Sequence, residues 1–461
     1  MLRNLAAIVL LSGLMLHAQY DTATVLGTVT DPSGAAVPNA KITLLNVQTG
    51  VSVRMNTDEN GSYQFLNQRI GSYKVTAEAG GFKQAASVDF TLTVNARQRV
   101  NMTLQVGEIT ESVTVTDSVR LLESDSSDRG QVVGRAAIVN LPLNGRAYAD
   151  LALLSPGVRK SNITARDASF NVNGLRSSLN NFMLDGVDNN AYGTSNQGFS
   201  NQIIQLNPDA VQEFKVQTNN FSAEYGRAGG AVINASLRSG TNEFHGAAWE
   251  FLRNTKLNAV GFFRPATGVK PVLVQNQFGA AFGGPIKKDK MFFFANYEGL
   301  RNVSRTLEYA SIPTPDQRLG KLGVSVKNPV TGDVYTDGVI PQSAITSFAR
   351  KVLSNLPTPI RSTAANAVPS NNWEYLTPVP IVDNKGDFRY DHYLNSKLNA
   401  FARYSHREMN RTENHVIPGP SGGGANGNVR VMNKQITTGF NYNATPTSVI
   451  DFRIGVSWFE H

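Results

Sequence analysis

Residues 205–251 are too polar to fold around a core of their own. This stretch, QLNPDAVQEFKVQTNNFSAEYGRAGGAVINASLRSGTNEFHGAAWEF, contains almost no continuous apolar run and is rich in Asn and Gly. Folding must offset the loss of chain entropy by burying apolar surface, and this segment has little to bury. We therefore expect other parts of the chain to supply walls around it, as a β-barrel encloses a polar plug.

The composition of the whole chain supports a barrel. Of its 461 residues 17% are charged, whereas soluble domains have about 25%. Low charge without a long apolar run is typical of outer-membrane barrels, whose strands alternate in hydropathy. The chain has no Cys, which excludes disulfides and zinc–thiolate sites. The Lys and Arg residues are dispersed and the six His lack ligand spacing, so we expect no nucleic-acid partner, metal or cofactor.

The N-terminus is typical of an export signal. Arg3 supplies a positive start, residues 5–16 an apolar run, and Ala18 a plausible cleavage position. A buried N-terminal helix or a short anchor is the alternative. Because strand-forming polar sequence follows at once, we expect residues 1–18 to be a signal peptide.

Residues 24–106 show the alternation and turn spacing of a small β-sandwich. Asn60-Gly61 predicts a hairpin turn, since both residues tolerate positive φ. The unit resembles the carboxypeptidase regulatory-like domain, a transthyretin-like β-sandwich. The matching motifs are GTVTD (27–31), PNA (38–40), TD (57–58), GSY (61–63) and GGF (80–82). The resemblance implies the fold and no peptidase activity.

Residues 107–117, GEITESVTVTD, form a linker with a strand-prone centre. The part that resembles the TonB box of TonB-dependent outer-membrane receptors consists of Glu111, Ser112, Val113, Thr114, Val115, Thr116 and Asp117. An extended, β-branched segment on a flexible tether can add as a strand to the open sheet edge of a partner. The resemblance implies that TonB, the inner-membrane energy-transducing complex, is that partner. An ordinary interdomain strand is the alternative.

Residues 118–242 are the expected plug, with a short helix near 147–154 that stops at Pro156-Gly157. The segment resembles the plug of Oar-like TonB-dependent transporters. The motifs that carry the resemblance are LPLNGR (141–146), NGLR (173–176), LDGVD (184–188), DAVQEF (209–214), AEYGR (223–227) and SGTN (239–242).

Several charged residues of the expected plug invite a functional interpretation. Asp185 and Asp188 are a candidate carboxylate pair for acid–base catalysis, but they flank a Gly turn, where Asp commonly forms local hydrogen bonds. We expect no catalytic residue. We expect Glu213, Glu224 and Arg227 to form ion pairs between the plug and the barrel wall.

Residues 243–461 predict the first part of a membrane barrel. In KLNAFARYS (397–405) and VIDFRIGVSW (449–458) apolar and polar residues alternate, and Phe401 interrupts the polar face. A soluble sheet shows the same alternation, but strands of about ten residues and clustered aromatics favour a bilayer. QFG (277–279), GGP (283–285), FFF (292–294) and YEGLR (297–301) resemble the start of an Oar-like barrel. We expect a short turn at 283–289 and an extracellular loop at about 302–382.

The predicted fold is mainly β: an N-terminal transthyretin-like β-sandwich, an α+β plug domain and an incomplete antiparallel transmembrane β-barrel. We count roughly seven strands after residue 243, whereas plugged transporters have about 22 strands. An open sheet in lipid leaves unpaired backbone groups. We therefore expect the chain to be a fragment or a truncated reading frame.

The resemblance implies a TonB-dependent receptor in the outer-membrane lipid, with its N-terminal domain in the periplasm. It would take up a bulky ligand, such as a peptide, glycan or chelate, that the external loops hold. A secreted or surface-attached β-sandwich adhesin or carbohydrate-binding protein is the alternative. The motifs HExxH and GxSxG and any Cys nucleophile are absent from the sequence, so we expect that the protein is not an enzyme.

Overall fold

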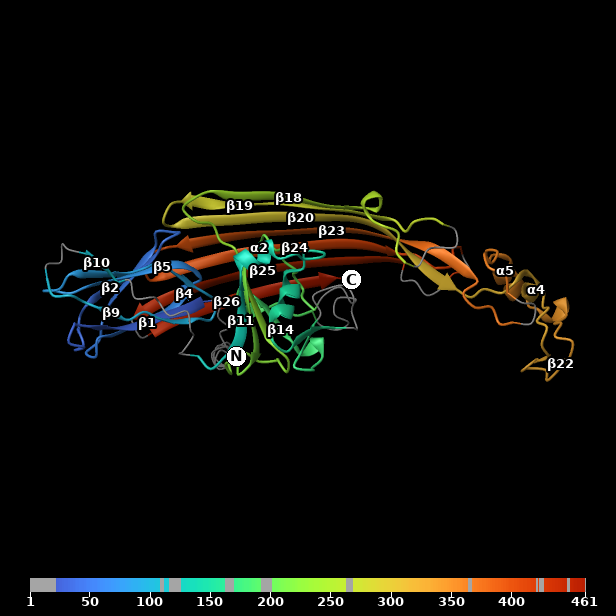
Figure 1. Cartoon of the computed structure of the whole chain (residues 1–461), viewed down its shortest axis with the longest axis horizontal. Helices are drawn as coiled ribbons and strands as arrows, with labels where there is room; N and C mark the ends of the chain where they lie inside the picture. Colours follow the sequence, from blue (N-terminus) through green and yellow to red (C-terminus); the bar gives the residue numbers. More distant parts are fainter. Residues whose placement is uncertain are drawn as a thin grey trace, which may run out of the picture.

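The computed structural model describes residues 22–107, 112–115, 126–161, 170–191, 201–262, 268–363, 367–419, 422, 427–445 and 448–460. The predicted signal peptide therefore lies outside the described residues, as do Glu111, Thr116 and Asp117. A long curved sheet dominates the molecule (Figure 1). The N-terminal unit lies at one end of this sheet, and the plug lies against its concave face.

The N-terminal unit is a β-sandwich with its apolar residues between two sheets. One sheet has the order β4-β1-β8, with β9 beside β1, and the other the order β10-β6-β5-β2-β3, with β7 beside β5. A Cβ at Gly27 would lie 1.9 Å from the Val100 carbonyl oxygen, so the close approach requires Gly. The strands are β1 (Thr22–Thr30), β2 (Lys41–Asn46), β3 (Ser52–Asn56), β4 (Ser62–Arg69), β5 (Gly71–Glu78), β6 (Gln84–Ser87), β7 (Phe90–Leu92), β8 (Arg97–Arg99), β9 (Met102–Thr103) and β10 (Ser112–Val115).

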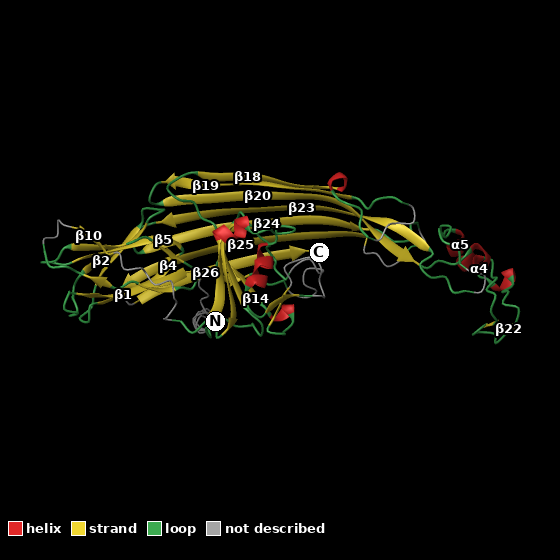
Figure 2. Ribbon diagram, in the orientation of Figure 1, coloured by secondary structure: helices red, strands yellow, loops and turns green. Residues whose placement is uncertain are grey.

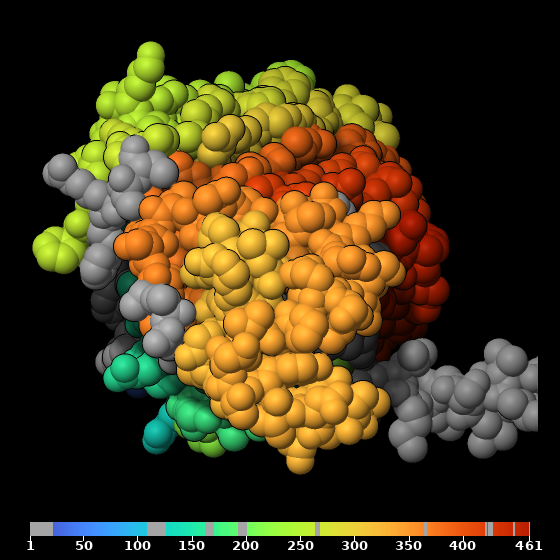
Figure 3. All heavy atoms as spheres, turned by 90° about the vertical axis from the view of Figure 1, so that its right-hand side faces the viewer, coloured from blue at the N-terminus to red at the C-terminus, as the bar shows by residue number. Residues whose placement is uncertain are grey.

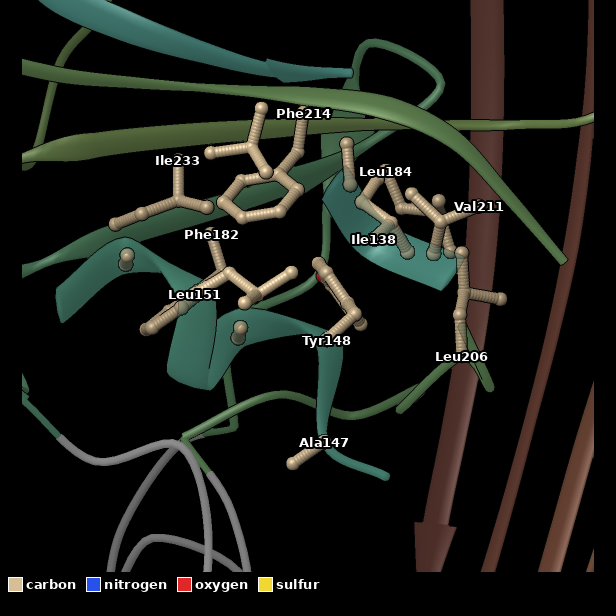
Figure 4. Close-up of a cluster of buried hydrophobic side chains, with 14 of the residues drawn as sticks. Ile138, Ala147, Tyr148, Leu151, Phe182, Leu184, Leu206, Val211, Phe214 and Ile233 are labelled. Carbon is tan, nitrogen blue, oxygen red and sulfur yellow. The ribbon is translucent and has the colours of Figure 1, made fainter. Parts of the chain in front are cut away.

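The plug is a small α+β unit around a sheet of order β11-β16-β17-β14-β15. Its core packs the short helices against this sheet (Figure 4), and the rings of Tyr148 and Phe214 meet edge to face at 5.3 Å. The predicted helix near 147–154 is a 3-10 helix, Tyr148–Leu154. The elements are β11 (Arg129–Gly134), α2 (Arg135–Asn140), η2 (Tyr148–Leu154), β12 (Val158–Lys160), β13 (Phe170–Val172), η3 (Ser177–Leu179), β14 (Asn181–Leu184), β15 (Val187–Asp188), β16 (Val211–Asn219) and β17 (Val232–Leu237).

The long sheet has seven antiparallel strands in the order β18-β19-β20-β23-β24-β25-β26, so neighbours in sequence are neighbours in space (Figure 2). Its strands are β18 (His245–Asn254), β19 (Leu273–Lys287), β20 (Met291–Ala310), β23 (Trp373–Tyr393), β24 (Leu398–Glu413), β25 (Gly427–Thr445) and β26 (Ser448–Glu460). Most exceed the length of about 9–11 residues that a tilted strand needs to cross a bilayer. No helix in the described part of the chain is long and apolar enough to span a membrane.

The long sheet is polar on its covered face and apolar on its exposed face. In β24, Arg403 is 1% exposed while its neighbour Tyr404 is 41% exposed. In β26, the outward residues Ile450, Phe452, Ile454, Val456 and Trp458 are all exposed. A sheet in a soluble protein buries its apolar face instead. The pattern fits a barrel wall with lipid outside and a polar lumen inside.

Two predicted connections differ from the structure. Strand β19 continues through Pro285 to Lys287, with a register shift beside Pro285, so the turn covers only 288–290 instead of 283–289. A bulge is where a strand tolerates Pro. Strands β20 and β23 remain paired out to Ala310 and Trp373, which shortens the predicted loop 302–382 to 311–372.

When the molecule is viewed from the end opposite the N-terminal unit, the loop 311–372 lies in front of the strands (Figure 3). It contains small elements of its own, with a capping box that starts its first helix. These elements are α4 (Pro315–Arg318), β21 (Val326–Lys327), β22 (Val334–Tyr335), η5 (Gln342–Ala344) and α5 (Ser347–Ser354). A further 3-10 turn, η4 (Thr255–Leu257), lies between β18 and β19.

Candidate functional site

A tight hairpin of the plug inserts a buried carboxylate into the barrel wall. Asp185 and Gly186 connect β14 to β15 with positive φ of 50° and 75°, as a two-residue hairpin turn requires. Asp185 is fully buried and lies 2.8 Å from Nη1 of Arg389 and 2.9 Å from Nε of Arg403. Nη1 of Arg453 donates to the Asp185 carbonyl oxygen at 3.0 Å. Three wall strands thus bind one plug turn.

The wall holds these arginines in fixed positions. Arg403 donates to the Ser405 hydroxyl at 2.7 Å and to Gln435 and Thr437 at 2.6 and 2.8 Å. On β26, a Cβ at Gly455 would lie 3.2 Å from the Val187 side chain, so the Gly admits the plug hairpin. A buried ion pair adds little net stability, but removing one partner leaves the other charge uncompensated. The contacts therefore fix the register of plug against wall.

A second anchor joins the plug to strands β18 and β20 of the sheet. Arg146 has a positive φ of 54° and follows Gly145 in the LPLNGR turn. Its guanidinium forms ion pairs with Asp209 of the plug and, at 2.9 Å, with Glu298 of β20. It also lies over the rings of Trp249 and Phe251 on β18, with its Cζ 5.2 and 4.4 Å from the ring centroids. Arg146 therefore combines charge pairing with ring stacking.

A charged chain connects the sandwich to the plug through the wall. Nη2 of Arg69, at the end of β4, lies 2.6 Å from Oδ1 of Asp391 on β23. Asp391 also accepts from Nε of Arg389 at 3.1 Å, and Arg389 in turn binds Asp185. Sandwich, wall and plug thus share one line of alternating charges.

The sandwich also touches the plug directly. The Glu213 carboxylate on β16 accepts a hydrogen bond from the Val94 amide, and Nδ2 of Asn95 donates to the Tyr225 hydroxyl at 2.5 Å. Burial raises the pKa of Glu213 to about 7, although the Val94 hydrogen bond and the Lys215 charge act in the opposite direction. Glu213 therefore titrates near neutral pH at a domain contact.

The three predicted site residues lie in two places. Glu213 contacts the sandwich, as described above. Arg227 lies 3.7 Å from Asp188 within the plug, with both side chains half-exposed, and Glu224 is partly buried in the same loop. The ion pairs of plug and wall described above involve Arg146 and Asp185, which lie in motifs already noted in the sequence.

The TonB-box-like segment falls partly within the described residues. Ser112–Val115 form β10, which pairs in parallel with Gln84–Ser87 of β6 at the edge of the sandwich. Within the described residues no group of three or more His, Asp or Glu is arranged to hold a metal ion.

Comparison with known proteins assigns each unit to a family. Residues 24–105 match the carboxypeptidase regulatory-like domain, residues 108–232 the TonB-dependent receptor plug domain, and residues 236–461 the outer membrane beta barrel domain. The TonB-dependent transporter Oar of Myxococcus xanthus is 29% identical over 290 residues, which cover 60% of this chain and 26% of that protein. The chain therefore spans about a quarter of the length of this curated relative.

Solved structures of similar proteins include the ferric enterobactin receptor of Pseudomonas aeruginosa. It is 10% identical with a TM-score of 0.42 and covers 72% of this chain and 41% of its own. The siderophore receptor PirA of Acinetobacter baumannii is 13% identical with a TM-score of 0.37 and covers 75% and 49%.

The three matched domains define an outer-membrane barrel with a plug and an N-terminal sandwich. The same three domains match family models of a TonB-dependent receptor plug, an outer membrane barrel and a carboxypeptidase regulatory-like domain, and the chain is similar to the TonB-dependent transporter Oar, as its sequence motifs predict.

Proposed function

We propose that this protein moves a bulky ligand across the outer membrane and that TonB supplies the energy through residues 111–117. The observation that carries the proposal is the mode of attachment of the plug. Its wall contacts are centred on the ion pairs of Asp185 and Arg146. These charged groups recover their hydration when a pulling force moves the plug away from the wall, whereas a large apolar interface would resist displacement.

The conformation of the box-like segment supports TonB as the partner. Ser112–Val115 already lie as a strand along a sheet edge, the conformation in which such a segment binds by strand addition. β-branched residues at 113–116 favour this extended form.

The connections of the sheet support a periplasmic position for the sandwich. The turns at the sandwich end are short, 288–290 and 394–397, whereas the opposite end has the connections 255–272, 311–372 and 414–426. Outer-membrane barrels have short periplasmic turns and longer extracellular loops. On this basis the sandwich lies in the periplasm, and loop 311–372 contributes to ligand capture outside.

Cysteine crosslinking in cells tests the proposed TonB contact. Residues 1–461 contain no Cys, so Val113→Cys introduces the only thiol of this part of the protein, and any Cys beyond it is replaced by Ser. We expect it to crosslink to a cysteine in the C-terminal domain of TonB. Ser33→Cys, in an exposed turn of the same sandwich, is the matched control and should not crosslink. Equal yields at the two positions, or none at Val113→Cys, would contradict the assignment.

A second variant separates TonB contact from ligand binding. Val113→Pro in the complete protein removes a backbone donor and disfavours strand pairing. We expect energised uptake to be lost while ligand binding at the cell surface persists. Unchanged uptake would exclude residues 111–117 as the contact.

A further inference from the structure

A cavity of about 260 Å³ lies where sandwich, plug and barrel wall meet. The sandwich contributes Thr49 and Arg69, the plug Ser236 and its neighbour Arg238, and the wall Arg389. The cavity is separate from the predicted TonB contact and from the extracellular loops.

The lining of this cavity is strongly cationic. It contains four guanidinium groups and His245, and no Asp or Glu is among the described residues that line it. The four arginines are Arg69, Arg135, Arg238 and Arg389. Arg69 and Arg389 share the carboxylate of Asp391, which lies behind the lining.

Arg238 carries the least compensated of these charges. Nη1 of Arg238 lies 3.4 Å from the Asp209 carbonyl oxygen, and its Cζ lies 5.0 Å from the centroid of the Phe294 ring. No carboxylate within the described ranges lies at ion-pair distance from it. Burial and the nearby charge of Arg135 together lower the pKa of Arg238 to about 10, although the charge of Asp209 acts in the opposite direction. A negative ligand would relieve both effects.

Two buried hydroxyls in the same lining have no hydrogen-bond partner. Thr49 is 7% exposed and Ser236 is 2% exposed, and no described group satisfies the Oγ1 atom of Thr49 or the Oγ atom of Ser236. Buried polar atoms are rarely left unpaired, so each such atom calls for a ligand or an ordered water. Hydroxyl donors beside guanidinium groups are suited to an anion with several oxygens.

We propose that this cavity binds a phosphate-class oxyanion, which would bridge the sandwich and the plug through Thr49, Ser236 and Arg238. Arg is favoured for phosphate because its planar fork offers paired donors. The volume admits inorganic phosphate or a small phosphate monoester. Occupancy would link Thr49 of the sandwich to Ser236 of the plug, so the anion would hold the two units together. The inference does not depend on the proposed TonB contact.

Calorimetric titration of the complete protein in detergent with inorganic phosphate, at constant ionic strength, tests this site. We expect one saturable site in the wild type. Thr49→Val and Ser236→Ala should each weaken binding by about tenfold, the effect of one hydrogen bond to a charged group. Arg238→Gln should weaken it at least as much. The matched controls, Arg97→Gln and Thr103→Val on exposed strand positions of the sandwich, should bind as the wild type does.

The hydroxyl variants keep the test independent of folding. Because neither hydroxyl has a partner, Thr49→Val and Ser236→Ala should melt at the wild-type temperature without phosphate. Absence of saturable binding, or equal affinity in the wild type and in both folded hydroxyl variants, would overturn the proposal. Glycerol 3-phosphate in a parallel titration distinguishes the sources: tighter binding of the monoester indicates a headgroup-type ligand, and tighter binding of inorganic phosphate a free anion.

Discussion

Asp185 of the plug and Arg403 of the barrel wall are both fully buried, and Oδ2 of Asp185 lies 2.9 Å from Nε of Arg403. The two residues are far apart in the sequence, and the contact exists only when the plug hairpin is inside the curved sheet. Arg389 binds the other carboxylate oxygen at 2.8 Å. One plug carboxylate thus pairs with two buried guanidinium groups of the wall.

Replacement of Asp185 should release the plug from the wall. Asp185→Asn keeps the shape of the turn but leaves the buried Arg403 without its carboxylate, a change that costs about 3–5 kcal/mol. Asp188→Asn, three residues away, is the matched control, because that carboxylate is half-exposed and its pair with Arg227 is worth about 0–1 kcal/mol. Urea unfolding, monitored by the proteolytic susceptibility of the plug, measures the stability of both variants. Equal effects would contradict a buried joint at Asp185.

Arg146 should not tolerate Lys. Arg146→Lys keeps the charge but loses the fork that reaches both Asp209 and Glu298 and the planar group over Phe251. We expect plug stability to fall by about 1–3 kcal/mol. Arg176→Lys, at an exposed plug position, should change it by less than about 0.5 kcal/mol. Wild-type stability of Arg146→Lys in the same unfolding assay would mean that charge alone anchors this turn.

The contact between Glu213 and the sandwich should depend on pH. The folded pKa of about 7 lies above the ordinary value of 4.5, so the folded state holds a proton that the unfolded chain releases. The contribution to stability is therefore fully present below pH 4.5 and is lost as the pH rises through 7. The loss is on the order of 3 kcal/mol, at 1.36 kcal/mol for each unit of pKa shift.

Glu213→Gln isolates this effect, because the amide cannot ionise and its oxygen can still accept from Val94. Melting temperatures from pH 5 to 8 should fall more steeply for the wild type than for Glu213→Gln. Parallel curves would show that Glu213 does not titrate between these limits in the folded protein.

The sequence predicts the alternation of the wall because each strand carries it locally. Arg403 and Tyr404 face opposite sides, as the period of two requires. Phe401, which interrupts the polar face, lies beneath three arginines, with the Cζ atom of Arg389 at 4.9 Å from its ring. An apolar residue in the lumen thus has a cation–π role that strand periodicity cannot reveal.

The partners of Asp185 could not be predicted from the sequence, for a different reason. The LDGVD motif predicts the turn correctly, but Arg389 follows it by 204 residues. Without the register of the sheet, nothing in the sequence selects Arg389 or Arg403 from the other arginines. The sequence also does not show how far β20 and β23 extend. Their residues near the loop are polar and look like loop residues, but their backbones still pair as an antiparallel ladder.

Fluorescence quenching by brominated lipids tests most directly the central claim that the sheet is a barrel wall with the plug on its inner face. Single-Trp variants of the complete protein, with the other tryptophans changed to Phe, separate the two faces. Trp458 points outward from β26 and is 52% exposed, whereas Trp249 packs against the plug core beneath Arg146. We predict strong quenching of Trp458 and little quenching of Trp249. Equal quenching of the two, or stronger quenching of Trp249, would contradict the account.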